Sequence, residues 1–320
     1  MTGVARSRAT VRIPLFFALS LFAGCPRAEA EPTPPAAVPA APKPAASVSI
    51  VPTPAASALA HPWLADAAAD LPKSVDTLEQ RFATPAGFTR VPVAPKSFGA
   101  FLRVLPLAAA GTPVLTHQGK VLHEATHPNI AAVVAIDIGK ADLQQCADSV
   151  IRMHAEWQWW LGKRDQHYST AGGPQMSFAK YLLGERHYWK DGKLATKNVG
   201  ATAATHPAFR TWLDQVFGSA NTGSLSKEAK VITVGELQPG DFVVMTGVPF
   251  GHAVMVLDLA KNADGKRIAL LGQGYMPAQS FQVLRKSPKE TWFVIDEASG
   301  KLETPFWDPF PWSTLRRLPD

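Results

Sequence analysis

The clearest helical pattern in the chain is ADLQQCADSVIRMHAEWQWWL, residues 141–161. Its apolar side chains recur every three or four positions, which is the spacing of one buried helix face. Asp142 is a suitable N-cap, and Gln145 three residues later completes a capping box. The pattern predicts a helix in which Cys146 ends the first turn on the inward face. His154 shares this face and is predicted to be a hydrogen-bonded core residue.

Three further segments have helical spacing. Residues 74–82 and 97–107 are predicted to be short helices, the second with two phenylalanines and two leucines along one side. Residues 209–217 are predicted to be helical within a region, 162–230, that otherwise mixes helix and loop. No internal repeat is present.

The strand patterns lie mainly in the second half of the chain. Residues 130–138, IAAVVAIDI, form an apolar run rich in β-branched residues that suits a buried strand, and Gly139 ends it. Short strands separated by turn residues are predicted after Gly240, at 242–246, 253–259, 267–273, 281–284 and 292–295, with a hairpin loop at 262–265. A helical first half followed by an antiparallel sheet predicts an α+β fold.

The N-terminal segment has the pattern of an export signal. Three arginines precede a ten-residue apolar run, 13–22, which is too short to span a bilayer as a mature helix. The run ends in Leu-Phe-Ala-Gly-Cys, which resembles the lipobox of bacterial lipoproteins. We expect a signal peptide at 1–24 and a lipid anchor on Cys25. Plain secretion with an incidental cysteine is the alternative.

A low-complexity segment separates the signal from the rest of the chain. Residues 25–58 contain nine prolines and almost no large apolar side chains, so they cannot bury a core. We expect a semi-extended tether of polyproline II character there and a single domain at 59–320. The protein is then an exported, membrane-anchored lipoprotein of the bacterial cell envelope.

Charge excludes one class of partner. Removal of the signal, which carries three arginines and no acidic residue, lowers the formal charge from +6 to +3. The remaining basic residues form no run and no stripe with interleaved aromatic residues, so nucleic acid is not an expected partner. The expected partners are the membrane, through the anchor, and a cell-envelope polymer or peptide.

Cysteine usage draws attention to one thiol. The chain has two cysteines, Cys25 and Cys146. If Cys25 carries a lipid, Cys146 has no disulfide partner in an oxidising compartment. Cys146 is then either a small buried core residue or a nucleophile.

Residues 122–128, LHEATHP, contain a match to the H-E-x-x-H pattern of zinc peptidases. That pattern needs a helix that turns His123 and His127 toward one ion, together with a third ligand. Here Pro128 biases His127 away from helical angles, and a strand rather than a helix follows. We therefore expect a polar loop, and a zinc peptidase that uses His123 and His127 is the least favoured function.

The second half of the chain contains a pattern that suggests thiol chemistry. LQPGD leads into the predicted strand at 242–246, and His252 in GHAVMV opens the next strand. Together with Cys146 near the start of a helix, this resembles the papain-like architecture of NlpC-type cell-wall cysteine peptidases. The resemblance implies a nucleophile-bearing helix packed on an antiparallel sheet.

A broader resemblance covers nearly all of residues 75–319. The chain resembles a family of uncharacterised bacterial exported lipoproteins, a domain of unknown function. The phrases that carry it are SFGAFLRVLPL, DIGKADLQQCADSVIRMHAEW, LQPGDFVVMTGVPFGHAVMVLDLA and LLGQGYMPAQ. They contain Cys146, His252 and Gln273.

The resemblances imply a catalytic group of three residues. Cys146 is the nucleophile, and the helix N-terminus with a nearby imidazolium is expected to lower its pKa. His252 is the base, and Gln273 on the following strand fixes its tautomer. Gln279 and Asp258 are rivals for this third role. Gln144, Gln145 or a backbone N–H at the helix start are candidates for binding an oxyanion.

Several of these residues also have structural interpretations. His252 can cap a strand, Cys146 can be a core residue, and Asp241 after Pro-Gly is expected to be a turn residue. The tryptophans at 157, 159 and 160 are expected to pack in the core rather than stack on a sugar.

The expected function is thiol-dependent amide hydrolysis or acyl transfer on cell-envelope material such as peptidoglycan peptide, without a cofactor. The alternative is a non-catalytic envelope lipoprotein that binds a peptide or glycan and in which Cys146 is inert.

Overall fold

The structure is a computed structural model that describes residues 61–66, 71–247 and 250–320. The predicted signal peptide, the tether and the lipid anchor at Cys25 lie outside the described residues. All the candidate catalytic residues lie inside them. No helix in the described ranges is long and apolar enough to cross a membrane.

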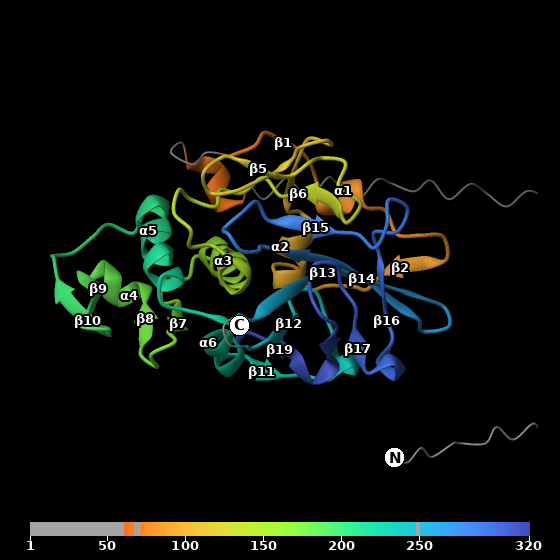
Figure 1. Ribbon diagram of the computed structural model, residues 1–320. Coiled ribbons are helices and arrows are strands. Elements are labelled where there is room, and N and C mark those ends of the chain that lie inside the picture. Colours follow the sequence, from red (N-terminus) through yellow and green to blue (C-terminus); the bar gives the residue numbers. More distant parts are fainter. Residues whose placement is uncertain (1–60, 67–70, 248–249) are drawn as a thin grey trace, which may run out of the picture. The chain divides into compact units, whose positions relative to one another are not determined.

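A nine-stranded antiparallel sheet forms the centre of the fold (Figure 1). The α+β class predicted from the sequence is confirmed. Along the sheet the order is β11 (Lys230–Val231), β19 (Leu315–Arg317), β12 (Phe242–Met245), β13 (His252–Asn262), β14 (Arg267–Gln273), β15 (Gln282–Leu284) and β6 (Ile130–Val133). Two further strands, β2 (Phe88–Arg90) and β16 (Phe293–Ile295), pair with β13 and β14.

Helices cover one face of this sheet. The long helix α3 (Cys146–Trp160) and the short helix α2 (Phe98–Arg103) both pack on β13. Alternate residues of β13 pack in the larger core cluster on the side of these helices. They are Ala253, Met255 and Leu257. This alternation is the period-two pattern of a strand that separates two apolar layers.

The other face of the sheet is covered by the C-terminal segments. Val254 and Val256 of β13 belong to a second core cluster, which includes Phe310 and Leu315. Residues of η2 (Val234–Glu236), β17 (Lys301–Leu302), β18 (Phe310–Pro311) and η4 (Trp312–Thr314) pack in this cluster, whereas η3 (Glu297–Ser299) has no buried residue. Central strands are therefore buried on both sides, and their sequences are almost continuously apolar.

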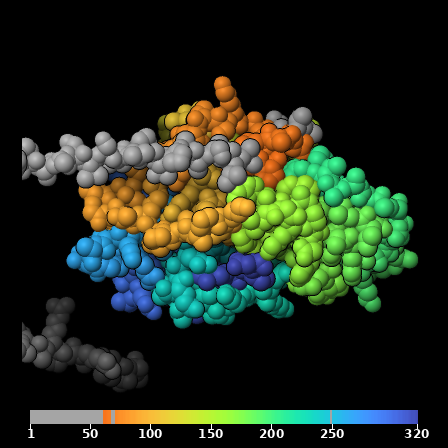
Figure 2. Space-filling view, turned by 180° about the vertical axis from the view of Figure 1, so that it is seen from behind, coloured from red at the N-terminus to blue at the C-terminus, as the bar shows by residue number. Residues whose placement is uncertain are grey.

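Residues 161–217 gather at one end of the domain (Figure 2). They form two hairpins, β7 (His167–Ser169) with β8 (Gln175–Ser177) and β9 (Glu185–Lys190) with β10 (Lys193–Asn198). The helices of this end are α4 (Phe178–Leu182) and α5 (His206–Phe217). The next helix, α6 (Thr222–Glu228), packs near α3 and β12. The sequence predicted α5 but not the four strands.

The N-terminal described region is a set of short elements. They are η1 (Pro62–Ala65), β1 (Ser74–Thr77), α1 (Leu78–Arg81), β3 (Pro106–Ala108), β4 (Val114–Leu115) and β5 (Val121–His123). The helix predicted at 74–82 is wrong in its first half, because residues 74–77 pair with β3. The helix predicted at 97–107 ends at Arg103, since Pro106 disfavours helical angles at the residue before it.

A charged network is buried beneath α3. Arg152 Nε lies 2.8 Å from Glu156 Oε1, and both side chains are fully buried. Asp137 accepts from Arg152 and Arg210, and His206 Nε2 lies 3.0 Å from Glu156 Oε2. The network joins α3, α5 and the segment after β6 by pairing opposite charges, as buried charges require.

Candidate functional site

The loop before α3 decides where the thiol is placed. Asp142 Oδ1 accepts from the backbone N–H of Ala278, 2.7 Å away, and from Gln145 Nε2, 3.0 Å away. Asp142 therefore anchors a loop instead of capping the helix as predicted. Gln145 is the N-cap, and Cys146 is the first helical residue rather than the end of the first turn.

The Cys146 thiol lies beside the first residues of β13. Its Sγ is 3.7 Å from the carbonyl oxygen of Gly251, the residue before His252. Cys146 is 5% exposed and lines a cavity of about 350 Å³. The remaining lining includes Asp142, Gln145, Asp148, Phe217, Asn221, Thr222, Phe250 and Met276. The cavity thus lies between the start of α3, the α5–α6 turn and the loop before β13.

Burial determines the protonation of the thiol. Desolvation raises the pKa of Cys146 to about 11, and the neighbouring charge of Asp148 adds to the increase. Backbone N–H groups, including that of Ala253, act in the opposite direction but do not reverse it. The sequence-based expectation of a lowered thiol pKa is wrong for this state, because burial outweighs the helix N-terminus. Cys146 is a thiol at neutral pH.

His252 is held by the second predicted partner. Its Nε2 lies 2.8 Å from Gln273 Oε1, and both side chains are buried. With an amide oxygen as its partner, Nε2 carries the proton and Nδ1 has the free lone pair. This Nδ1 is buried and has no hydrogen-bond partner among the described residues.

The surroundings of His252 keep its imidazole neutral. Desolvation lowers the pKa of His252 to about 4, and the hydrogen bond with Gln273 offsets this only in part. Tyr275, Trp307 and Phe310 surround the ring, with centroids 4.8, 4.9 and 6.1 Å away. The Tyr275 hydroxyl donates to the carbonyl of Phe306, which holds this aromatic cover in place.

The rival residues for the third role have other environments. Asp258 accepts from Arg90 and Arg103, one on each carboxylate oxygen, at 2.6 and 2.8 Å. Gln279 is buried, but neither of its side-chain polar atoms has a partner within the described part of the chain. Of the three candidates, Gln273 is the one that bonds His252.

The two glutamines that are candidates for binding an oxyanion lie in different environments. Gln144 is fully buried, and its Oε1 accepts from Arg152 Nη1 at 3.0 Å, on the inner side of α3. Gln145 lines the cavity with Cys146. Asp241 is confirmed as a turn residue, since its carboxylate accepts from the N–H of Gln238, and it also binds Arg317.

One family model matches this chain. It is described as "Domain of unknown function (4846)" and matches residues 78–317. The chain belongs to this family. Comparison with curated proteins and with solved structures finds no significant match. The family match extends from α1 to β19 and therefore includes Cys146, His252 and Gln273.

Within this family domain, the H-E-x-x-H stretch is a strand end followed by turns. His123 ends β5, and residues 124–129 are irregular, as expected from Pro128. The His123 and His127 rings lie 4.8 Å apart, and both contact Phe306. In the described ranges no three His, Cys, Asp or Glu side chains are grouped so that they could hold a metal ion.

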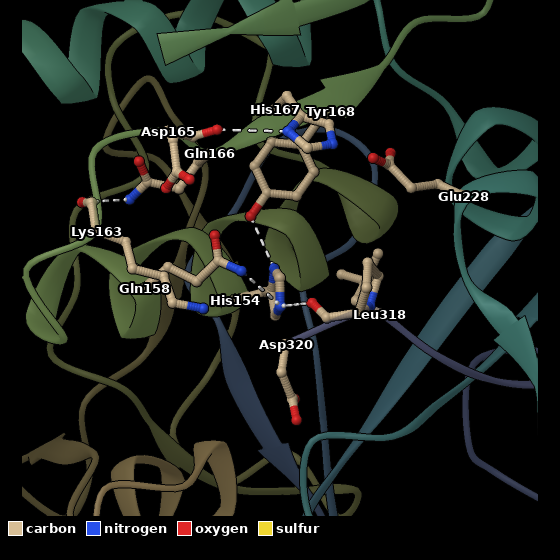
Figure 3. Close-up of a pocket in the computed structure, with 11 residues that line it drawn as sticks. His154, Gln158, Lys163, Asp165, Gln166, His167, Tyr168, Glu228, Leu318 and Asp320 are labelled. Atoms are coloured by element: carbon tan, nitrogen blue, oxygen red, sulfur yellow. Dashed lines mark hydrogen bonds between the residues drawn. The ribbon is translucent and has the colours of Figure 1, made fainter. Parts of the chain in front are cut away.

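His154 is the hydrogen-bonded core histidine that the sequence predicted. It borders a second cavity, of about 330 Å³ (Figure 3). Nδ1 lies 2.8 Å from the Tyr168 hydroxyl and Nε2 lies 3.0 Å from the carbonyl of Pro319. Burial lowers the pKa of His154 to about 3. The tryptophans of α3 also pack in the core as predicted.

Sequence reasoning missed Asp148, Tyr275 and Trp307. Asp148 is three residues after the N-cap Gln145, which is the position of a capping-box partner. The sequence pattern placed the N-cap of the helix at Asp142 instead of Gln145, so it did not reveal Asp148 as the capping-box partner. No pattern in the sequence near Trp307 predicts its contact with His252, because the two residues are 55 positions apart in the chain.

Proposed function

We propose that this protein is a thiol-dependent amide hydrolase or acyltransferase with a papain-like arrangement. Cys146 is the nucleophile, His252 is the base, and Gln273 orients His252. One observation carries the proposal. The hydrogen bond from His252 Nε2 to Gln273 Oε1 leaves Nδ1 of His252 as an unpartnered base. His252 directly follows Gly251, whose carbonyl oxygen lies 3.7 Å from Cys146 Sγ. A base oriented by a third group is the recurring pattern of nucleophilic catalysis.

The reaction begins from a neutral pair. Because the thiol pKa is about 11 and the imidazole pKa about 4, a preformed thiolate–imidazolium pair is disfavoured in this state. Sγ attacks the substrate carbonyl carbon while His252 Nδ1 takes the thiol proton. The same proton then goes to the leaving amine, and a thioester remains on Cys146. Water or an acceptor amine resolves it.

The substrate proposed is a peptide of the cell envelope, such as peptidoglycan peptide. The cavity beside Cys146 combines apolar side chains, Phe217 and Phe250, with polar ones, Asn221 and Thr222, which suits a peptide. Export by a signal at 1–24 and attachment through Cys25 and the 25–58 tether would bring the domain to such material. No cofactor takes part in this chemistry, and no nucleic acid is involved.

A non-catalytic binding lipoprotein is the second candidate, and one observation favours it. Cys146 is 5% exposed, and burial raises its pKa, which are properties of an inert core thiol. In that case the cavity would hold a peptide or glycan without reaction.

Acylation of the full-length protein by 4-nitrophenyl acetate separates the two candidates. Intact-mass and peptide mass spectrometry should place an acetyl group on Cys146 of the folded wild type, and Cys146→Ala gives the background at other residues. His252→Ala should slow this acylation by roughly 10²–10⁴-fold. Gln273→Ala should slow it less. A thiol that is acylated only after unfolding would refute the enzyme and favour the binding protein.

A further inference from the structure

One carboxylate oxygen of Asp148 is hydrogen-bonded to the backbone, and the other has no hydrogen-bond partner among the described residues. Its Oδ2 accepts from the backbone N–H of Gln145 at 3.1 Å, which caps α3. Asp148 is 6% exposed, and its Oδ1 is buried with no hydrogen-bond partner among the residues described. A buried polar atom of this kind costs free energy unless a ligand or water completes it.

The residue that carries this unpartnered oxygen lines the same cavity as the proposed nucleophile. Asp148 and Cys146 both line the 350 Å³ cavity, two residues apart in the first turn of α3. The other titratable side chain of the described lining is Asp142, whose Oδ1 is already bonded to Ala278 and Gln145. The lining residues from the α5–α6 turn, the loop before β13 and Met276 are uncharged. No basic side chain of the described lining therefore competes for Asp148.

The carboxyl group carries its proton at neutral pH. Desolvation raises the pKa of Asp148 to about 8. An ionised Asp148 would oppose ionisation of the thiol, since its charge raises the pKa of Cys146. The acid form is therefore the one compatible with attack by sulfur, and a buried carboxylic acid is an effective hydrogen-bond donor to developing negative charge.

We propose that Asp148, as a carboxylic acid, donates a hydrogen bond to the oxyanion formed when Cys146 attacks a substrate carbonyl; this inference rests on the proposed thiol chemistry. The S–C bond forms, the carbonyl π pair moves to oxygen, and the thiol proton moves to His252 Nδ1. The Asp148 O–H donates to this oxygen without transferring its proton. When the C–O double bond re-forms, the C–N bond breaks and the amine leaves with the proton from His252. Asp148 thus stabilises charge that exists only in the transition state and the intermediate.

The test compares two reactions of the same thiol in the full-length protein. Acylation of Cys146 by 4-nitrophenyl acetate creates an oxyanion, whereas alkylation by iodoacetamide does not. Both reactions use the same sulfur atom. Changes in the pKa of the thiol or in its accessibility to reagents therefore cancel in the ratio of the two rate constants. Mass spectrometry of the Cys146 peptide measures both rates.

Asp148→Ala should lower the acylation-to-alkylation ratio by at least about tenfold, as expected for the loss of one oxyanion donor. Asp148→Asn should stay within about threefold of the wild type. Its amide oxygen can accept from Gln145, which leaves the NH₂ group to donate into the cavity. Asp264→Ala, in the exposed β13–β14 hairpin, is the control and should leave the ratio unchanged.

A second measurement holds even if Asp148→Ala does not fold. Raising the pH from 7 to 9.5 should lower the wild-type ratio, because Asp148 loses its proton, and should leave the Asp148→Asn ratio constant. An unchanged ratio in Asp148→Ala, or an Asp148→Asn variant as impaired as Asp148→Ala, would overturn the donor role while the enzyme proposal stands. If neither reagent modifies Cys146 of the folded wild type, the proposed function itself fails.

Discussion

His252 and Gln273 bond across adjacent antiparallel strands, with Nε2 and Oε1 2.8 Å apart. The register explains the contact. Met255 of β13 pairs with Gly272 of β14, so the next residue of β14, Gln273, extends toward the start of β13 where His252 lies. Gln273 is also paired with Gln282 of β15, which places its backbone inside the sheet rather than in a loop. The orientation of the imidazole is therefore fixed by strand pairing.

Removal of the Trp307 indole should raise the pKa of His252. Desolvation is the main cause of the low value of about 4, and the Trp307 ring lies 4.9 Å from the imidazole. In Trp307→Ala water reaches the ring, so its pKa should move toward the ordinary value of about 6.5. NMR titration of the His252 ring protons measures the change. Trp189→Ala, on exposed β9, should leave it unaltered, and an unchanged His252 titration in Trp307→Ala would contradict the assignment.

Asp148→Asn should stabilise the protein at pH 8 but not at pH 3.5. Below about pH 3.8 the carboxyl is protonated in both the folded and the unfolded chain. As the pH rises from there to about 8, the unfolded chain loses this proton first, so the native state is progressively disfavoured. An asparagine cannot ionise and removes the penalty. We expect Tm to rise by about 2 °C or more at pH 8.

Thermal unfolding at pH 3.5 and pH 8 measures the direction of the Tm change in Asp148→Asn. Asp264→Asn is a matched control in an exposed hairpin and should show the same small shift at both. An equal Tm change for Asp148→Asn at pH 3.5 and pH 8 would mean that Asp148 is ionised in the native protein.

Glu156→Ala should be strongly destabilising. It leaves the fully buried Arg152 without the partner 2.8 Å from its Nε and removes the acceptor of His206. Breaking a buried ion pair on one side costs about 3–5 kcal/mol of unfolding free energy. Urea denaturation measures it. Glu303→Ala, which breaks an exposed pair with Lys301, should not change the midpoint measurably, and comparable effects of the two would refute the role of the network.

Gly274→Ala should disturb the start of α3. A β-carbon there would overlap Ser149 Oγ and lie 2.9 Å from the carbonyl oxygen of Gln145. Ser149 donates to this same carbonyl, so the first turn must shift. We expect a loss of about 1–3 kcal/mol, typical of overpacking, together with a changed alkylation rate of Cys146. Gly172→Ala, whose β-carbon would meet nothing closer than 3.9 Å, is the control for denaturation and alkylation.

Local patterns in the sequence determined much of the fold. The 3.6-residue spacing predicted the body of α3 and α5. Short apolar runs between turn residues after Gly240 predicted the strands that carry His252 and Gln273. Pro128 correctly indicated a non-helical H-E-x-x-H stretch. Long phrases in order correctly indicated a domain of unknown function over most of the chain. These features depend on neighbours in the chain, so the chain alone reveals them.

Tertiary contacts decided the rest. α3 begins at Cys146 because Asp142 binds the N–H of Ala278, 136 positions away, and residues 74–77 form a strand because β3 lies beside them. Asp258 is bound by Arg90 and Arg103, which no spacing rule predicts. The pKa of the thiol rises rather than falls because burial of Cys146 depends on the packing of α3 against β13. Desolvation is a property of the surroundings in space, and the sequence around a residue does not contain it.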